Sequence, residues 1–175
     1  MAVTIVATVG SASANSFVTL AEAATYMEAR LNATSWESTA TTDQKNRALV
    51  EATRELSARV WLGERTDTTQ ALSWPREWVV NPDSPTSDYY DNNVVPQRLK
   101  DATCELAFEF IRAGTSDVAT QDSLQNIVSE TVGPLSTTYA QPYDRAKGLS
   151  RYPNVMRYIR PLLAATSIST PVVRG

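Results

Sequence analysis

Hydrophobic residues recur at helical spacing most clearly between Pro96 and Gly114. One face repeats every three or four positions and carries Leu99, Ala102, Leu106 and Phe110. A second apolar stripe is formed by Cys104, Phe108 and Ile111. Proline suits the first turn of a helix, and glycine suits the left-handed position just past its end. The pattern predicts a helix between these two residues, and its two apolar stripes indicate a central position.

Two further helices are predicted before this one. Thr19 and Glu22 have the spacing of a capping box, so a helix is expected to begin there and to run to about Leu31. The next helix begins at Thr42, and its apolar face is Ala48, Leu49, Ala52, Leu56 and Val60, with Trp61 at its end and Gly63 as the cap.

A last helix is predicted to open at Tyr152-Pro153, with Val155, Met156, Ile159, Leu162 and Leu163 as its apolar positions. Pro161 lies inside that pattern and should kink or stop the helix.

The remaining segments are expected to be extended or looped. In the connection over 32–41, we expect Trp36 to cover the core rather than to serve as a binding platform. Pro75 forces Trp74 into an extended conformation, which predicts a fixed elbow. The loop over 79–95 is long for a compact domain, and such loops tend to be functional. Alternation around the turn signal Gly133-Pro134 predicts an antiparallel hairpin at about 124–140.

The length and composition fit one domain with arms. Hydrophobic residues make up 42% of the 175 residues, which is enough for a core and too many for a disordered chain. We therefore expect a mainly α protein: a small bundle of about four helices with a β-hairpin and extended arms at both ends. The expected organisation is an extended N-terminal arm over 1–18, a helical domain over 19–163 and an extended C-terminal tail over 164–175.

The composition offers little material for catalysis. The chain has no histidine and one cysteine, so it lacks the commonest general base and cannot assemble a Cys/His zinc site. Cys104 is expected to be a small buried hydrophobe. Glu105 and Glu109 are four residues apart, where a solvated helix edge is the expectation. We predict no enzymatic activity, no cofactor and no metal.

No apolar run reaches the roughly 18 residues that span a bilayer, and the N-terminus lacks the basic region of a signal peptide. We therefore expect the chain to be made in the cytoplasm.

Charge divides the chain unevenly. Residues 140–175 hold six basic residues and one acidic residue, a net charge of +5, whereas residues 1–139 hold ten basic and eighteen acidic residues, a net charge of −8. This division favours head-to-tail contact between copies, docking of the tail on an acidic partner, or a simple solvated surface. Aromatic and basic residues alternate over 143–160, as in single-strand binders, but the pI of about 5.0 argues against nucleic-acid binding.

Several short motifs over residues 13–165 resemble, in their order, tailed-phage head–tail connector (adaptor) proteins. They are Asn15–Ala23, Ala48–Thr53, Trp61–Gly63, Gln70–Arg76, Val94–Pro96 before Glu105–Ala107, Ser129–Leu135 and Leu162-Leu163. Leu72–Arg76 is the most specific of them. Similar sequences also carry the label DnaT-like single-stranded DNA-binding protein.

The connector resemblance implies a non-enzymatic virion protein at the neck. Such proteins form a ring, typically of twelve copies, below the portal protein. The ring extends the channel through which genomic double-stranded DNA passes without specific binding, and it docks the next neck or tail component. The alternative hypothesis is a monomeric or small-oligomer single-stranded DNA-binding protein.

Two sets of residues are candidates for contact. Trp74 and Arg76 are predicted at a subunit interface, with the alternative that Trp74 covers its own core and Arg76 pairs locally. In related connectors the C-terminal segment reaches the portal, which makes Tyr158, Arg160 and Arg174 the candidates for portal binding.

Overall fold

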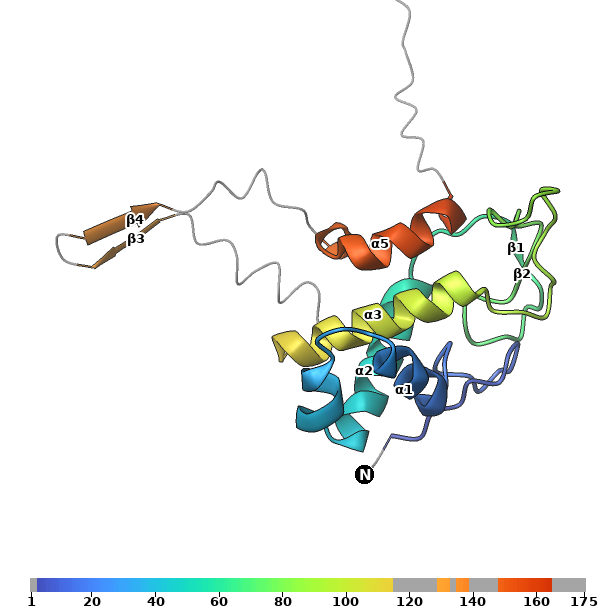
Figure 1. Cartoon of the computed structure of the whole chain (residues 1–175). Coiled ribbons are helices and arrows are strands. Elements are labelled where there is room, and N and C mark those ends of the chain that lie inside the picture. Colours follow the sequence, from blue (N-terminus) through green and yellow to red (C-terminus); the bar gives the residue numbers. More distant parts are fainter. Residues whose placement is uncertain (1–2, 115–128, 133–134, 139–147, 165–175) are drawn as a thin grey trace, which may run out of the picture.

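The computed structural model describes residues 3–114, 129–132, 135–138 and 148–164 (Figure 1). Its α-helices are α1 (Leu20–Glu28), α2 (Thr42–Ser57), α3 (Gln97–Ala113) and α5 (Pro153–Ile159). A π-helical turn covers Ser35–Thr39, and 3-10 turns cover Gly148–Arg151 and Arg160–Leu162. Within these ranges, no helix has the length and apolar character needed to cross a membrane.

Two short antiparallel pairs of strands complete the fold. Strand β1 (Glu64–Arg65) pairs with β2 (Arg76–Glu77), and β3 (Ser129–Val132) pairs with β4 (Leu135–Thr138). The second pair confirms the predicted hairpin, because Val132 is opposite Leu135 across the expected turn. The mainly α fold with a β-hairpin is therefore confirmed.

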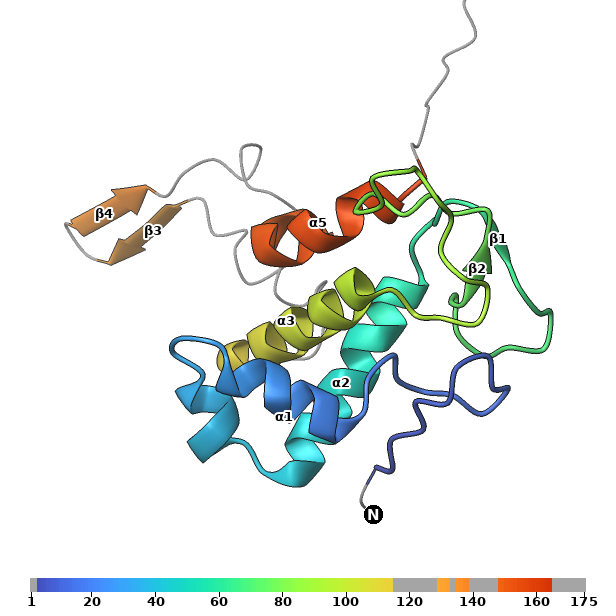
Figure 2. The same cartoon turned by 45° about the vertical axis from the view of Figure 1, so that its right-hand side comes forward.

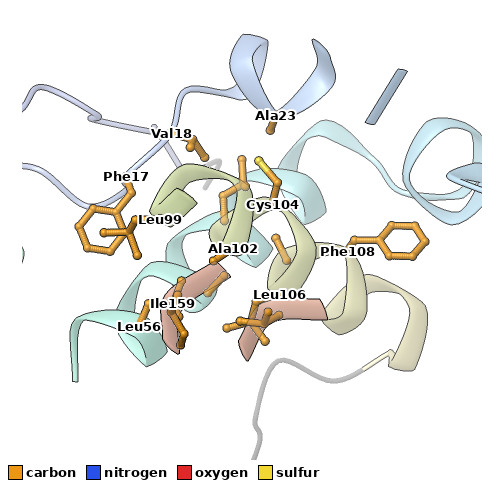
Figure 3. Packing of buried hydrophobic residues seen from close by; sticks show 14 of the residues in the cluster. Phe17, Val18, Ala23, Leu56, Leu99, Ala102, Cys104, Leu106, Phe108 and Ile159 are labelled. Atoms are coloured by element: carbon orange, nitrogen blue, oxygen red, sulfur yellow. The ribbon is translucent and has the colours of Figure 1, made fainter. Parts of the chain in front are cut away.

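The predicted central helix is α3. It lies between α5 on one side and α1 on the other, and α2 crosses it (Figures 1 and 2). Pro96 is its N-cap and Gly114 its left-handed C-cap at φ 69°. Figure 3 shows side chains of the N-terminal segment, α1, α2 and α5 gathered around α3. A helix surrounded in this way needs apolar residues on several faces, which explains the two stripes in its sequence.

Two helices end earlier than their apolar periodicity predicts. Helix α1 ends at Glu28, so Leu31 lies outside it and is 88% exposed. Helix α2 ends at Ser57, and the exposed Val60 is not part of its apolar face. The chain leaves α2 because residues 60–62 pair with residues 162–164, which follow α5: the backbone N–H of Leu62 donates to the Leu162 carbonyl at 3.0 Å.

Residues 3–18 are extended, and they are held by their own chain. The backbone N–H of Val3 donates to Asp43 Oδ1 at 3.1 Å, and Asn46 Nδ2 donates to the Val3 carbonyl at 2.9 Å. Phe17 and Val18 are buried in the core. The N-terminal arm is thus extended, as expected, and over residues 3–18 it is held by contacts within its own chain. Residues 165–175, most of the predicted tail, lie outside the described residues.

Three single-residue expectations are confirmed. Trp36 is buried in the core. Cys104 is also buried, and burial raises the pKa of its thiol to about 12. At Pro161 the α-helical pattern has stopped, since α5 ends at Ile159 and continues as a 3-10 turn.

Candidate functional site

The segment Gln70–Arg76 forms the fixed elbow that its sequence predicts. Trp74 is only 1% exposed, and its peptide bond with Pro75 is cis. Its ring makes T-shaped contacts with Trp61, at 5.9 Å between centroids, and with Tyr90, at 6.2 Å. The elbow thus joins the end of α2 to the loop that precedes α3.

Polar side chains hold the elbow from both ends. The buried Gln70 donates from Nε2 to the carbonyls of Leu72 at 2.8 Å and Pro75 at 3.1 Å. Arg76 donates from Nε to the Leu62 carbonyl at 2.7 Å and from Nη2 to the Gly63 carbonyl. Each bond satisfies a carbonyl that a loop would otherwise leave without a partner. The sequence reasoning missed the role of Gln70, because a lone glutamine carries no pattern.

The structure therefore brings Trp74 and Arg76 together inside one chain. Trp74 packs on its own core and Arg76 binds its own carbonyls, which is the alternative left open from the sequence. Their predicted place at a subunit interface stays a prediction.

Gly63 is needed where the segment after α2 passes close to the backbone that follows the elbow. Its φ is +65°, and a Cβ at this position would come within 2.0 Å of the Glu77 carbonyl oxygen and 2.8 Å of Val79 Cγ2. Neither the backbone oxygen nor the buried Val79 can move away at low cost.

We expect Gly63→Ala to lower the free energy of unfolding by about 3 kcal/mol, combining left-handed strain with overpacking. Urea unfolding followed by circular dichroism measures the change. Gly114→Ala is the matched control, because its φ is +69° and nothing lies within 4 Å of the added Cβ. That control should lose only about 1 kcal/mol, from backbone strain alone. Equal losses in the two variants would show that the contact with Glu77 is not important.

The loop after the elbow exposes an aromatic surface, which we define as Trp78, Val80 and Tyr89. Val80 pairs with Tyr89 in an antiparallel bridge, and the neighbouring Val79 and Tyr90 face the core. Because side chains alternate along extended backbone, Val80 and Tyr89 project outward, and Trp78 lies beside Tyr89 at a bend in the chain. Trp78 is 68% exposed and Tyr89 56% exposed, and their rings form a T-shaped pair at 5.9 Å.

The cations of residues 3–114 are already engaged. This part of the chain has ten basic and fifteen acidic residues, a net charge of −5. Ion pairs are formed by Arg30, Arg47, Arg54, Arg59, Arg98, Lys100 and Arg112. Arg65 and Arg76 bind backbone carbonyls, and Lys45 lies over the Trp36 ring. The acidic body therefore has no surplus cation for a phosphate.

The segment around α5 carries a net positive charge, in contrast to residues 3–114. Residues 148–164 contain three arginines and no acidic residue. We define the α5 edge as Arg157, Tyr158 and Arg160. The Arg157 guanidinium lies over the Tyr158 ring, 4.9 Å from its centroid. Arg160 is exposed, and within the described residues its guanidinium forms no ion pair or hydrogen bond.

The structure thus brings Tyr158 and Arg160, two of the three residues predicted for portal binding, onto one helix end. Arg174, the third, lies outside the described residues. Portal binding itself stays a prediction.

A partly buried polar network connects the α5 edge to the core. The Tyr158 hydroxyl lies 3.4 Å from that of Tyr26, which donates to Glu105 Oε1 at 2.9 Å. Glu105 also forms an ion pair with Arg30 at 3.0 Å, and its side chain is 7% exposed. The expected solvated edge at Glu105 and Glu109 is therefore wrong: both are buried, because α1 and α5 cover the helix face that carries Glu105.

Comparison with known protein families matches residues 1–175 to the family described as "Putative DnaT-like ssDNA binding protein". No curated protein and no solved structure matches the chain. These findings contain no evidence for the head–tail connector resemblance.

Proposed function

The chain belongs to this DnaT-like ssDNA-binding family, and from that premise we propose that it binds single-stranded DNA through the α5 edge. The match over the whole chain is the observation that carries the proposal. The α5 edge is the place we assign to it, because its surroundings combine free positive charge with an aromatic ring.

The chemistry of the α5 edge suits a flexible nucleic-acid strand. Single-strand binders combine cations, which track the phosphates, with aromatic rings, on which bases stack. Arg160 is free to meet a phosphate, and Arg157 is exposed beside Tyr158. The net charge of −5 over residues 3–114 repels DNA elsewhere. We therefore expect binding that is weak, independent of base sequence and strongly dependent on salt.

The test is fluorescence anisotropy with a labelled oligothymidylate of about 20 nucleotides, titrated at several salt concentrations. We expect Arg157→Ala/Arg160→Ala to weaken binding about tenfold, and to reduce the slope of log K against log salt by about 1.4, since two phosphate contacts are lost. Circular dichroism should show an unchanged fold, because both arginines are exposed.

The matched control is Arg47→Ala/Arg54→Ala, which removes two exposed arginines of α2. Its affinity and salt slope should stay within twofold of the wild type. Absence of binding by the wild-type protein, or equal losses in the two double variants, would refute the proposal.

A second candidate function is that of a head–tail connector in a tailed phage. It is supported by the order of the connector-like motifs and by the acidic body, whose like charge lets genomic DNA slide past without tight contact. In this role the protein would form a ring, with twelve copies as the expected number, beneath the portal protein. It would reside in the virion neck and dock the next neck or tail component.

This candidate is tested by mixing the purified protein with its portal protein and imaging the mixture by negative stain. Rings stacked on portal particles would support it. Protein that stays apart from the portal at micromolar concentration would count against it.

A further inference from the structure

We propose that the aromatic surface of one copy receives the α5 edge of a second copy. This inference goes beyond single-stranded DNA binding, because it concerns a second surface, on the loop that follows the elbow. It assigns a partner to the exposed Trp78 and Tyr89 rings, for which nothing else in the described chain provides one.

The aromatic surface is rigid although it is exposed. Beneath it, Val79 is buried and Tyr90 packs on Trp74, so the outer residues are fixed in position by the core. Trp78 has a φ of +61°, a left-handed conformation that costs a residue other than glycine about 1–3 kcal/mol. A strained backbone that places an exposed tryptophan on a firm base is typical of a recognition site.

The charge around this surface selects a cationic partner. A hollow of about 470 Å³ beside the two rings is lined by Glu77, Trp78, Tyr89, Tyr90, Asp91 and Asn92. Its charged lining residues are both acidic, and within residues 3–114 no lysine or arginine lies over the Trp78 or Tyr89 ring. Aromatic faces and carboxylates both attract guanidinium groups, whereas the same carboxylates repel phosphates. The hollow therefore suits an arginine side chain better than a nucleotide.

The chain itself carries a matching arginine surface. Arg157 and Arg160 are exposed at the end of α5, in a segment with a net charge of +3. The same chain already places a guanidinium against an aromatic ring elsewhere, where the Arg30 guanidinium lies 4.1 Å from the centroid of the Phe108 ring. Charge complementarity between the α5 edge and the aromatic surface thus favours a second copy as the occupant.

The proposed contact joins two different surfaces, so it is heterologous. Each copy offers an aromatic surface to one neighbour and an α5 edge to the other. Association then continues from copy to copy, and it ends only if the geometry closes a ring.

Sedimentation velocity at micromolar concentration and low salt tests the contact. We expect the wild-type protein to form species larger than a monomer, and high salt to shift them toward the monomer because charge contributes to the contact. Trp78→Gly/Tyr89→Ser and Arg157→Glu/Arg160→Glu should each weaken association at least tenfold. Glycine accepts the φ of Trp78, so the first variant should keep its fold. The control is Leu31→Ser, which removes an exposed leucine that belongs to neither proposed surface. This variant should associate like the wild type.

Mixing the two defective variants gives the sharpest readout. The first keeps an intact α5 edge and the second keeps an intact aromatic surface, so an equimolar mixture should form 1:1 dimers and nothing larger. A mixture that stays monomeric would overturn the proposal, as would a wild-type protein that is monomeric at both salt concentrations. The proposal would also be overturned if the wild type remains a monomer and an added arginine-rich peptide changes tryptophan fluorescence in the wild type but not in Trp78→Gly/Tyr89→Ser.

Oligonucleotide titrations separate this inference from the proposed function. Trp78→Gly/Tyr89→Ser should bind single-stranded DNA at least as tightly as the wild type, because its α5 edge is intact and is not covered by a neighbouring copy. Arg157→Glu/Arg160→Glu should lose both activities. If neither the wild type nor any variant binds DNA, but the wild-type copies still associate with one another, the DNA proposal fails and the contact between copies stands.

Discussion

Trp74→Ala is expected to lower the free energy of unfolding by about 4 kcal/mol, the typical cost of removing a buried tryptophan. Trp74 is among the largest fully buried side chains, and its ring joins Trp61 to Tyr90. Removing it leaves a cavity between the end of α2 and the loop before α3. The fixed positions of Gln70 and Arg76 prevent the elbow from collapsing into that cavity. Urea unfolding followed by circular dichroism measures the loss.

Two further variants separate packing from other effects. Trp74→Phe keeps most of the buried area and removes an indole N–H that has no hydrogen-bond partner among the described residues, so it should lose less than half as much. Trp78→Ala removes a tryptophan of the same loop that is 68% exposed, and should cost less than about 1 kcal/mol. Equal losses for Trp74→Ala and Trp78→Ala would mean that the elbow does not pack as described.

The parts of the fold that local sequence specifies were predictable. Capping residues and 3.6-residue periodicity act within a few positions, so the starts of α1 and α2, the bounds of α3 and the end of α5 shortly before Pro161 follow from the sequence. The end of α2 did not follow, because residues 60–62 pair with Leu162 and Leu163, about a hundred positions away. A periodic pattern cannot report a contact with a distant segment.

The candidate site was predictable only in outline. Tyrosine and arginine interleave over 143–160, and this region contains the α5 edge, since charge and aromatic content are visible in the sequence. The sequence analysis nevertheless assigned Tyr158 and Arg160 to portal binding, because the low pI argued against nucleic acid. The aromatic surface was missed as a surface, because the outward direction of Trp78 and Tyr89 depends on the bridge between two parts of one long loop. Glu105 was misassigned for a related reason: its ion pair with Arg30 joins positions 75 residues apart.

The buried carboxylate of Glu105 in α3 is expected to make the second large contribution to stability. We expect Glu105→Ala to lower the free energy of unfolding by about 3 kcal/mol, because it leaves the Arg30 guanidinium without its carboxylate and the Tyr26 hydroxyl without its acceptor. The value is taken at the low end of the range for buried pairs, since the Arg30 side chain is 21% exposed and keeps its contact with Phe108. Urea unfolding at neutral pH gives the measurement.

Glu51→Ala is the matched control, because it breaks a carboxylate–arginine pair that is largely exposed on α2. It should cost less than about 1 kcal/mol. Glu105→Gln is the informative intermediate: it removes the charge but retains an oxygen that accepts from Tyr26, so its loss should fall between those of the other two variants. The network extends from Glu105 through Tyr26 to Tyr158, and Glu105→Ala should therefore also loosen the α5 edge. Amide hydrogen exchange in α5 that increases in Glu105→Ala but not in Glu51→Ala would establish that link, whereas equal exchange in both would show that α5 is held by its apolar residues alone.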